Sequence, residues 1–203
     1  QSPQLLQLSG VGPAAFLKRK GISVVHDLRG VGKNLQDHLQ IRVIHRCTKR
    51  ITTNDDMQSP LRKLKMGLKY ALFRSGPLAI GINQAGAFVR TRPELSTPDI
   101  QFHFAALSAD MPGAPLHKFS GFTSSVCQLR PQSRGTVMIK SADPLEPPAM
   151  QANYLSSEID RQTVVAGLKA ARKIAASPAL QSYIVDEYMP GKDVQSDEKL
   201  LEF

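Results

Sequence analysis

Residues that could move protons gather at the end of the stretch Gly30–His38, GVGKNLQDH. It ends on Asp37 and His38, both of which can hold or transfer a proton. Because they are adjacent in sequence, their side chains point apart on most backbones, so they are not expected to act as a relay pair. Gly30 and Gly32 allow a sharp turn. We interpret the stretch as a crossing between two domains that also lines a site; an ordinary helix–strand connection is the alternative.

Other chemistry-bearing residues do not form a complete catalytic set. The chain has no G-x-S-x-G, H-E-x-x-H, Walker or G-x-G-x-x-G motif. His38 and His45 are seven residues apart in extended chain and are poor candidates for one metal site. Cys47 and Cys127 lie in separate strand-like runs without motif spacing, which favours buried reduced thiols over a disulfide. No metal site is predicted.

The composition is that of an ordinary globular protein: 203 residues, of which 41% are hydrophobic and 21% charged. No apolar run approaches the roughly 20 residues that cross a bilayer. The net charge of +9 comes from scattered residues with small clusters at Lys18–Lys20, Arg62–Lys65 and Arg172–Lys173. These predict solvated helix faces. Without Trp or interleaved basic and aromatic residues, no nucleic-acid partner is expected, and a basic binding module is kept only as an alternative.

The N-terminal part predicts short elements. Ser2-Pro3 is a helix start, and helices are expected over 2–8 and 14–20, followed by a short buried strand over 22–25. Gly10 and Gly12 lie between the helices, where backbone N–H groups can approach an anion or a ring. A tight turn explains this glycine pair equally well.

The remainder predicts mostly antiparallel strands, over 40–48, 84–91, 99–107, 121–129 and 135–140, with a loop over 54–59. The connection 130–135 between the last two resembles a hairpin. A long helix over 158–176 has an apolar stripe, and so does a basic helix over 60–73, whose Lys and Arg residues favour a solvated face over a membrane anchor. The expected fold class is α+β.

The strand 99–107, DIQFHFAAL, alternates most clearly. Ile100, Phe102 and Phe104 face one side, and Gln101 and His103 face the other. His103 is therefore a solvent-side or a cavity-side residue.

Several motifs in order carry a family resemblance. SPQLLQLSGVGP (2–13) and KRKGISVVHDLRGVGKNLQDH (18–38) are followed by SGPL, QAGAFVRT, PDIQFHF, RPQSRGTVMIKSADP, NYLSSEIDRQ and SDEKLLEF. The first resembles the signature S-P-x-L-L-x-x-S-G-[VI]-G of the glucose–methanol–choline (GMC) oxidoreductases. Together they resemble the choline and alcohol dehydrogenase branch of that family over essentially the whole chain.

The resemblance implies FAD-dependent oxidation of an alcohol by hydride transfer to the flavin. It also implies an interior fragment, in which 1–38 is the remnant of the FAD-binding domain with the crossing segment. Residues 39–203 would be the substrate-binding domain, an antiparallel sheet backed by helices and incomplete at its C-terminus. The family's FAD fingerprint would lie upstream of Gln1 and its catalytic His beyond Phe203, so no catalytic residue is expected here and the fragment alone is expected to be inactive.

The resemblance also implies site residues. Those on the cofactor side are Ser2, Ser9, Gly10, Gly12, Asn34, Asp37 and His38, and those on the substrate side are Gln84, Phe102 and His103. Choline-specific relatives tend to carry a Glu at the position of Gln84, where a carboxylate suits a trimethylammonium group. Its absence favours a neutral alcohol or polyol as the small-molecule substrate.

The resemblance leaves other choices open. A non-redox relative like the hydroxynitrile lyases, in which FAD is structural, is the alternative within the family. The electron acceptor is not indicated. We expect a cytoplasmic protein without a membrane span; peripheral membrane association of the parent is the alternative location.

Overall fold

A computed structural model describes all residues from Gln1 to Phe203, and the chain divides into two compact units. The first unit consists of 1–38 and 131–161, and the second of 39–130 and 162–203. The sequence-based division at residue 38 treated everything after it as one domain. The structure differs, because 131–161 pack with the N-terminal residues.

The N-terminal half of the first unit contains α1 (Ser2–Leu8), β1 (Val11–Gly12), α2 (Ala14–Arg19) and β2 (His26–Asp27), with the two strands parallel. Both predicted helices are confirmed. The predicted strand over 22–25 is wrong: Val25 is 75% exposed, and pairing begins at His26. The reason is the sharp turn at Gly10, whose φ is +84° and whose carbonyl accepts the N–H groups of Val25 and His26.

Residues 131–161 join this unit through hydrogen bonds to the N-terminal half. Strands β7 (Thr136–Met138) and β8 (Ala149–Gln151) form an antiparallel pair. The fully buried Gln7 donates from Nε2 to the Val137 carbonyl (3.0 Å), and its Oε1 accepts the Ile139 N–H (3.0 Å). Leu35 and Gly135 form an antiparallel bridge. The predicted hairpin over 130–135 is therefore wrong, since β7 pairs with β8 instead.

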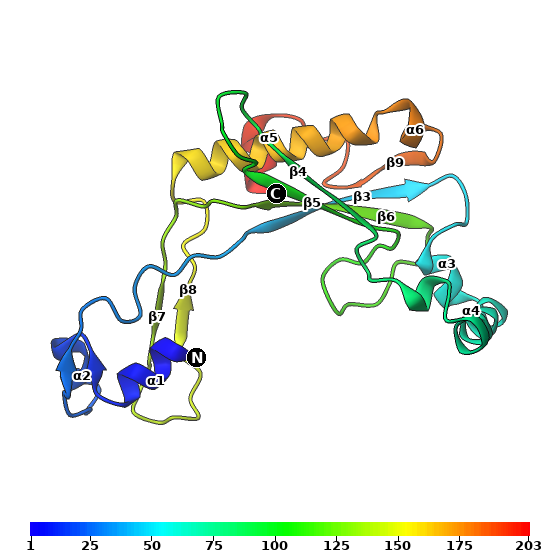
Figure 1. Ribbon diagram of the computed structural model, residues 1–203. Coiled ribbons are helices and arrows are strands. Elements are labelled where there is room, and N and C mark those ends of the chain that lie inside the picture. Colours follow the sequence, from blue (N-terminus) through cyan, green and yellow to red (C-terminus); the bar gives the residue numbers. More distant parts are fainter. The chain divides into compact units, whose positions relative to one another are not determined.

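The second unit is built on a five-stranded antiparallel sheet in the order β4-β5-β6-β3-β9, which confirms the α+β class (Figure 1). The strands are β3 (Gln40–Cys47), β4 (Ala85–Val89), β5 (Ile100–Ala105), β6 (Gly121–Gln128) and β9 (Ile184–Met189). The sequence predicted the first four but missed β9.

Helix α5 (Glu158–Ala175) covers one face of this sheet with its second-unit residues (Figure 1). Its Val164 and Leu168 are 2% and 1% exposed. A Cβ placed on Gly167 would lie 2.5 Å from Val126 Cγ1, so the helix backbone approaches the sheet closely. Phe102 pairs with Val126 in register and therefore lies on this covered face.

The remaining helices of the second unit are α3 (Thr53–Gln58), α4 (Pro60–Phe73), the short 3₁₀ helix η1 (Pro77–Ala79), α6 (Pro178–Gln181) and α7 (Asp197–Glu202). Helix α4 has the predicted bounds, but the predicted loop over 54–59 is mostly α3. Thr52 and Asp55 explain this helix, because they form a reciprocal capping box at its start. None of the helices has the length and apolar character needed to cross a membrane.

Candidate substrate cavity and flavin-side residues

A cavity of about 340 Å³ lies over the face of the sheet opposite α5. Its polar wall contains Gln40, Arg42, Asn83, Thr123 and Ser125. The apolar wall comes mainly from the segment between β5 and β6 and includes Ala105, Leu107, Ala109, Met111 and Leu116. Such a mixture, with a few polar groups in an apolar surround, is typical of a site for a small organic ligand.

Strand register brings the polar wall together. Arg42 of β3 pairs with Ser125 of β6, which pairs in turn with His103 of β5. Because directly paired residues point to the same side of a sheet, these three side chains lie on the face opposite α5. Thr123 lies two residues before Ser125 and has the same orientation; its Oγ1 donates to the Leu107 carbonyl at 2.8 Å.

A buried amide holds the loop that forms the apolar wall. Asn54 of α3 is fully buried, and its Nδ2 donates to the carbonyls of Ser108 (3.0 Å) and His117 (2.9 Å). Its Oδ1 accepts the Ser108 N–H at 2.9 Å. The His117 N–H donates to the Ser108 carbonyl at 3.0 Å. One side chain therefore ties both ends of the loop to α3.

Arg42 is the only charged residue that lines the cavity. Its Nη1 donates to the Ala109 carbonyl at 3.2 Å, which connects the sheet to the loop. No carboxylate lines the cavity. The electrostatics of this site therefore suit a neutral or negatively charged molecule better than a cation.

The three predicted substrate-side residues occupy different places. Gln84 lies beside the lining residue Asn83, and its Oε1 accepts the Ala106 N–H at 3.1 Å. His103 is on the cavity face, next to Ser125, but does not itself line the cavity. Phe102 is 4% exposed on the face that α5 covers, which makes it a core residue of this unit.

The space beside the two predicted glycines on the cofactor side is filled by other residues of this chain. Gly10 is buried, and a Cβ there would lie 2.4 Å from the Ser23 carbonyl oxygen. Gly12 is buried too, and its carbonyl accepts the Leu28 N–H. Close approach of backbone to backbone therefore accounts for Gly10, whereas a Cβ on Gly12 would meet only the side chains of Gln7 and Leu17, at 3.4 Å and beyond. Ser2 is the first residue of α1 and Ser9 follows the helix as its C-cap, and both are exposed.

The crossing segment offers polar groups at the surface of the first unit. Asn34, Asp37 and His38 are all exposed, and Asn34 has a φ of +63°. The Tyr154 hydroxyl donates a hydrogen bond to Asp37 Oδ2, and this bond to the carboxylate raises the pKa of Tyr154. An amide, a carboxylate and an imidazole at the surface suit the hydroxyl and ring polar atoms of a flavin nucleotide, so these residues fit that group better than the glycines do.

The sequence missed Arg42, Asn83, Thr123, Ser125 and Asn54 as site residues. Alternation in strands 40–48 and 121–129 was the available signal, since it separates the polar from the apolar members. It could not show that these polar members share one face, because register is set by pairing that a single sequence does not reveal.

Neither cysteine forms a disulfide: Cys47 and Cys127 are both free. Burial raises the pKa of the Cys47 thiol, so it is protonated near neutral pH. No group of three or more His, Cys, Asp or Glu side chains has an arrangement that could hold a metal ion.

Comparison with known proteins identifies the family. A family model described as GMC oxidoreductase matches residues 131–203. Oxygen-dependent choline dehydrogenase from Serratia proteamaculans is 41% identical over 199 residues, which are 98% of this chain and 36% of that protein. Alcohol dehydrogenase [acceptor] from Pseudomonas putida is 39% identical over 200 residues, again 98% of this chain and 36% of the relative. The chain thus spans just over a third of these relatives.

Solved structures share the fold. A formate oxidase variant from Aspergillus oryzae superposes with a TM-score of 0.86 at 23% identity, covering 99% of this chain and 40% of that one. Pyridoxine 4-oxidase from Mesorbium loti gives 0.77 at 23% identity, covering 99% and 35%. Sequence identity along nearly the whole chain, the match to the family model and the common fold agree with one another. The chain belongs to the GMC oxidoreductase family.

Proposed function

We propose that this chain is part of an FAD-dependent oxidoreductase that oxidises the CH–OH group of a small alcohol. Family membership supports this, together with the names of relatives, which are choline and alcohol dehydrogenases. The names differ in the electron acceptor, so oxygen and an artificial acceptor both belong in the assay. FAD would supply the hydride acceptor when bound.

Each unit has its own part in this proposal. In the first unit, Asn34, Asp37 and His38 would contact the cofactor. In the second, the cavity over the sheet would receive the substrate. Its apolar loop excludes water from the carbon chain, and the hydroxyls of Thr123 and Ser125 orient the polar end of the alcohol by hydrogen bonds.

The proposed class of substrate rests on the charge of the residues that line the cavity. Arg42 lines it and no carboxylate does, so a trimethylammonium group would meet a positive charge without compensation. Gln84 at its edge carries no charge to offset this. The proposed substrate is therefore a neutral alcohol or polyol, although several of the relatives are named for choline.

The test compares choline with neutral primary alcohols of similar size as substrates of the full-length gene product. We expect kcat/KM to be at least about tenfold higher for the best neutral alcohol, which corresponds to roughly 1.4 kcal/mol of differential binding in the transition state. A strong preference for choline would overturn the substrate assignment. Absence of flavin from the purified protein, with no turnover of any alcohol, would overturn the oxidoreductase proposal itself.

A charge variant sharpens the test. Gln84→Glu keeps an oxygen that can accept the Ala106 N–H and adds one negative charge at the edge of the cavity. We expect it to shift the kcat/KM ratio toward choline by roughly fivefold to tenfold. The matched control is Gln181→Glu in α6, which adds the same charge outside the cavity and should leave the ratio unchanged.

The loop provides a second variant. Asn54→Ala removes the hydrogen bonds that hold Ser108 and His117, so the apolar wall should become mobile. We expect a rise in KM of about tenfold with a smaller change in kcat, because the reacting groups lie elsewhere. An unchanged KM in a folded Asn54→Ala protein would separate this loop from substrate binding.

A further inference from the structure

Helix α4 presents a row of leucines that nothing in this chain covers. Leu61, Leu64, Leu68 and Leu72 recur at helical spacing and are 75%, 59%, 52% and 70% exposed. Phe73 extends the row and is 72% exposed. A shallow apolar groove of about 580 Å³ follows the row. Single exposed leucines are ordinary, but a continuous row of five large apolar side chains marks an interaction surface.

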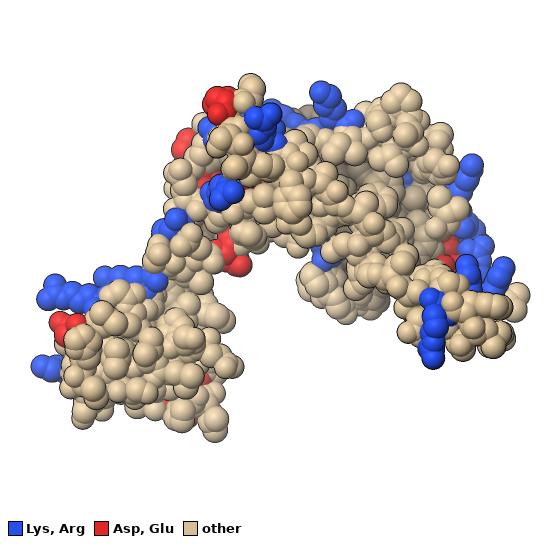
Figure 2. Space-filling model, in the orientation of Figure 1, with Lys and Arg blue, Asp and Glu red and all other residues tan.

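All charges on α4 are positive. The helix carries Arg62, Lys63, Lys65 and Lys69 and no acidic residue, and Arg74 follows at its C-terminal cap. Lys and Arg side chains project into solvent in this part of the second unit (Figure 2). The helix is therefore amphipathic, with an outward apolar row and basic flanks.

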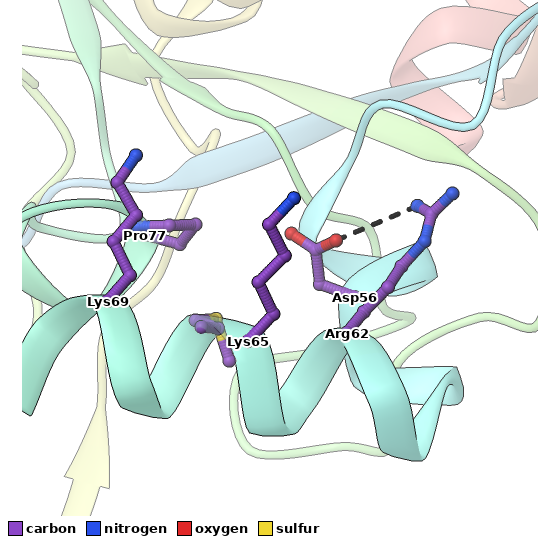
Figure 3. Close-up of a pocket in the computed structure, with 6 residues that line it drawn as sticks. Asp56, Arg62, Lys65, Lys69 and Pro77 are labelled. Carbon is purple, nitrogen blue, oxygen red and sulfur yellow. Dashed lines mark ion pairs between the residues drawn. The ribbon is translucent and has the colours of Figure 1, made fainter.

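A basic pocket adjoins the leucine row. It has a volume of about 350 Å³ and is lined by Arg62, Lys65, Lys69, Asp56, Met66 and Pro77. Figure 3 shows the two lysines and the arginine extending from one side of α4. Asp56 is the only carboxylate, and it lies 3.7 Å from the Arg62 guanidinium. Both lysines are left without an acidic partner in the pocket.

Lys65 and Lys69 connect the two features. They line the apolar groove and also the basic pocket. A ligand that reaches both must therefore present apolar groups beside anionic groups along the length of the helix. Lysine side chains at such a boundary can lay their methylene stems on the apolar surface while their ammonium groups contact anions.

The positive charge of α4 limits which partner could cover its leucine row. A second copy of this chain would bring its own basic α4 against the first, so like charges would face each other. A nucleic acid would pair with the lysines but leave the leucines in water. The surface of an anionic lipid bilayer supplies acyl chains and phosphates at adjacent depths, and it satisfies both features.

We propose that α4 binds the surface of a membrane containing anionic phospholipids. The leucine row enters the boundary between headgroups and acyl chains, with the helix parallel to the membrane plane. Arg62, Lys65 and Lys69 contact lipid phosphates. The sequence alone favoured a solvated basic face. The exposure of the leucine row and its shared border with the pocket change that interpretation.

The experiment is co-sedimentation of the full-length gene product with vesicles. One set contains phosphatidylglycerol and phosphatidylcholine in roughly equal amounts, and the other phosphatidylcholine alone. We expect at least about tenfold tighter binding to the anionic set, weakened by salt. Lys65→Gln with Lys69→Gln should reduce this binding by roughly tenfold to thirtyfold. Leu64→Ser with Leu68→Ser should reduce binding by about a hundredfold.

Matched controls separate α4 from general surface effects. Lys173→Gln removes an exposed lysine from α5, and Leu145→Ser removes a leucine that is 88% exposed in the first unit. Both should bind like the unaltered protein. Equal binding to the two vesicle sets, or α4 variants that bind like the controls, would overturn the proposal. So would a leucine variant that changes from dimer to monomer without losing vesicle binding, since α4 would then contact a second copy.

Discussion

The two long helices, α4 and α5, have similar sequence patterns and opposite environments. Both place apolar residues at helical spacing, and both have charged residues between them. Yet Val164 and Leu168 of α5 are 2% and 1% exposed, whereas Leu64 and Leu68 of α4 are 59% and 52% exposed. One helix packs on a sheet, and the other turns its apolar row outward.

Amphipathic spacing therefore predicts a helix without predicting what covers its apolar side. The sign of their charges also distinguishes the two helices. Helix α5 combines acidic and basic residues, with Glu158 and Asp160 in its first turn and Arg172 and Lys173 in its last, which complements the helix dipole. Helix α4 has basic residues only. That single sign of charge suits an anionic surface better than a protein core.

The largest expected effect comes from truncating one leucine in each helix. Leu168→Ala should lower the free energy of unfolding by about 2–5 kcal/mol, because it leaves a cavity between α5 and the sheet. Leu68→Ala should change it by less than about 0.5 kcal/mol, since that side chain is already in water. Urea unfolding followed by circular dichroism measures both. Similar losses in the two variants would mean that α4 is also part of a packed core.

Helix bounds were the most predictable part of the fold. Pro60 at the start and the leucine spacing predicted α4 over 60–73, and α5 ends within a residue of its prediction. Pro fits the first turn of a helix and the spacing is local, so both signals survive in any context. Strand β9 was missed because IVDEYM lacks a clear alternation, and it is a strand through its pairing with β3.

The candidate site was predictable only in outline. Gln84 and His103 were predicted from a resemblance and from alternation, and both lie near the cavity without lining it. Arg42 and Ser125 line it because β3 and β6 pair in one particular register. Such non-local pairing, like the packing of 131–161 against the N-terminal residues, depends on contacts between distant segments. Composition and periodicity of a single chain carry no record of them.

An ion-pair comparison should give the second-largest effect. Arg172 of α5 donates to Glu187 from Nε (2.9 Å) and Nη2 (2.7 Å), and the two side chains are 20% and 13% exposed. Arg172→Ala leaves a mostly buried carboxylate without this partner and should cost about 2–3 kcal/mol of unfolding free energy. Arg62→Ala breaks a longer, more exposed pair and should cost at most about 1 kcal/mol. Equal costs would contradict the difference in burial.

The glycines of the two helices should respond with opposite signs. Gly167→Ala gains helix propensity, but its Cβ would lie 2.5 Å from the buried Val126, so we expect a net loss of about 1 kcal/mol. A Cβ on Gly67 meets nothing within 4 Å, and Gly67→Ala should stabilise α4 by about 0.5–1 kcal/mol. Thermal unfolding of both variants is the measurement. Stabilisation by Gly167→Ala would show that α5 can move away from the sheet at little cost.

The smallest expected effect is a pH dependence of the free energy of unfolding, which arises from a histidine on the sheet face covered by α5. His45 of β3 is 4% exposed and stacks on Phe122, with ring centroids 5.0 Å apart. Desolvation by burial lowers the pKa of His45, although the nearby Glu187 carboxylate opposes this shift. The unfolded chain keeps the ordinary pKa near 6.5. Between these two pKa values the unfolded state binds the proton and the folded state does not.

The free energy of unfolding should therefore be fully retained above about pH 6.5 and should fall as the pH decreases toward the folded-state pKa. His45→Phe keeps an aromatic ring and removes the titration, so its stability should change less between about pH 7.5 and about pH 5.5. His45 lies in β3 and not in α4, so vesicle binding through α4 should not weaken over that pH range. If His45→Phe has the same pH slope as the unaltered protein, other groups cause the loss. If vesicle binding falls together with the free energy of unfolding as the pH decreases, membrane binding by α4 depends on the packing of α5 against the sheet. The two helices would then be less different than the exposed fractions of their leucines indicate.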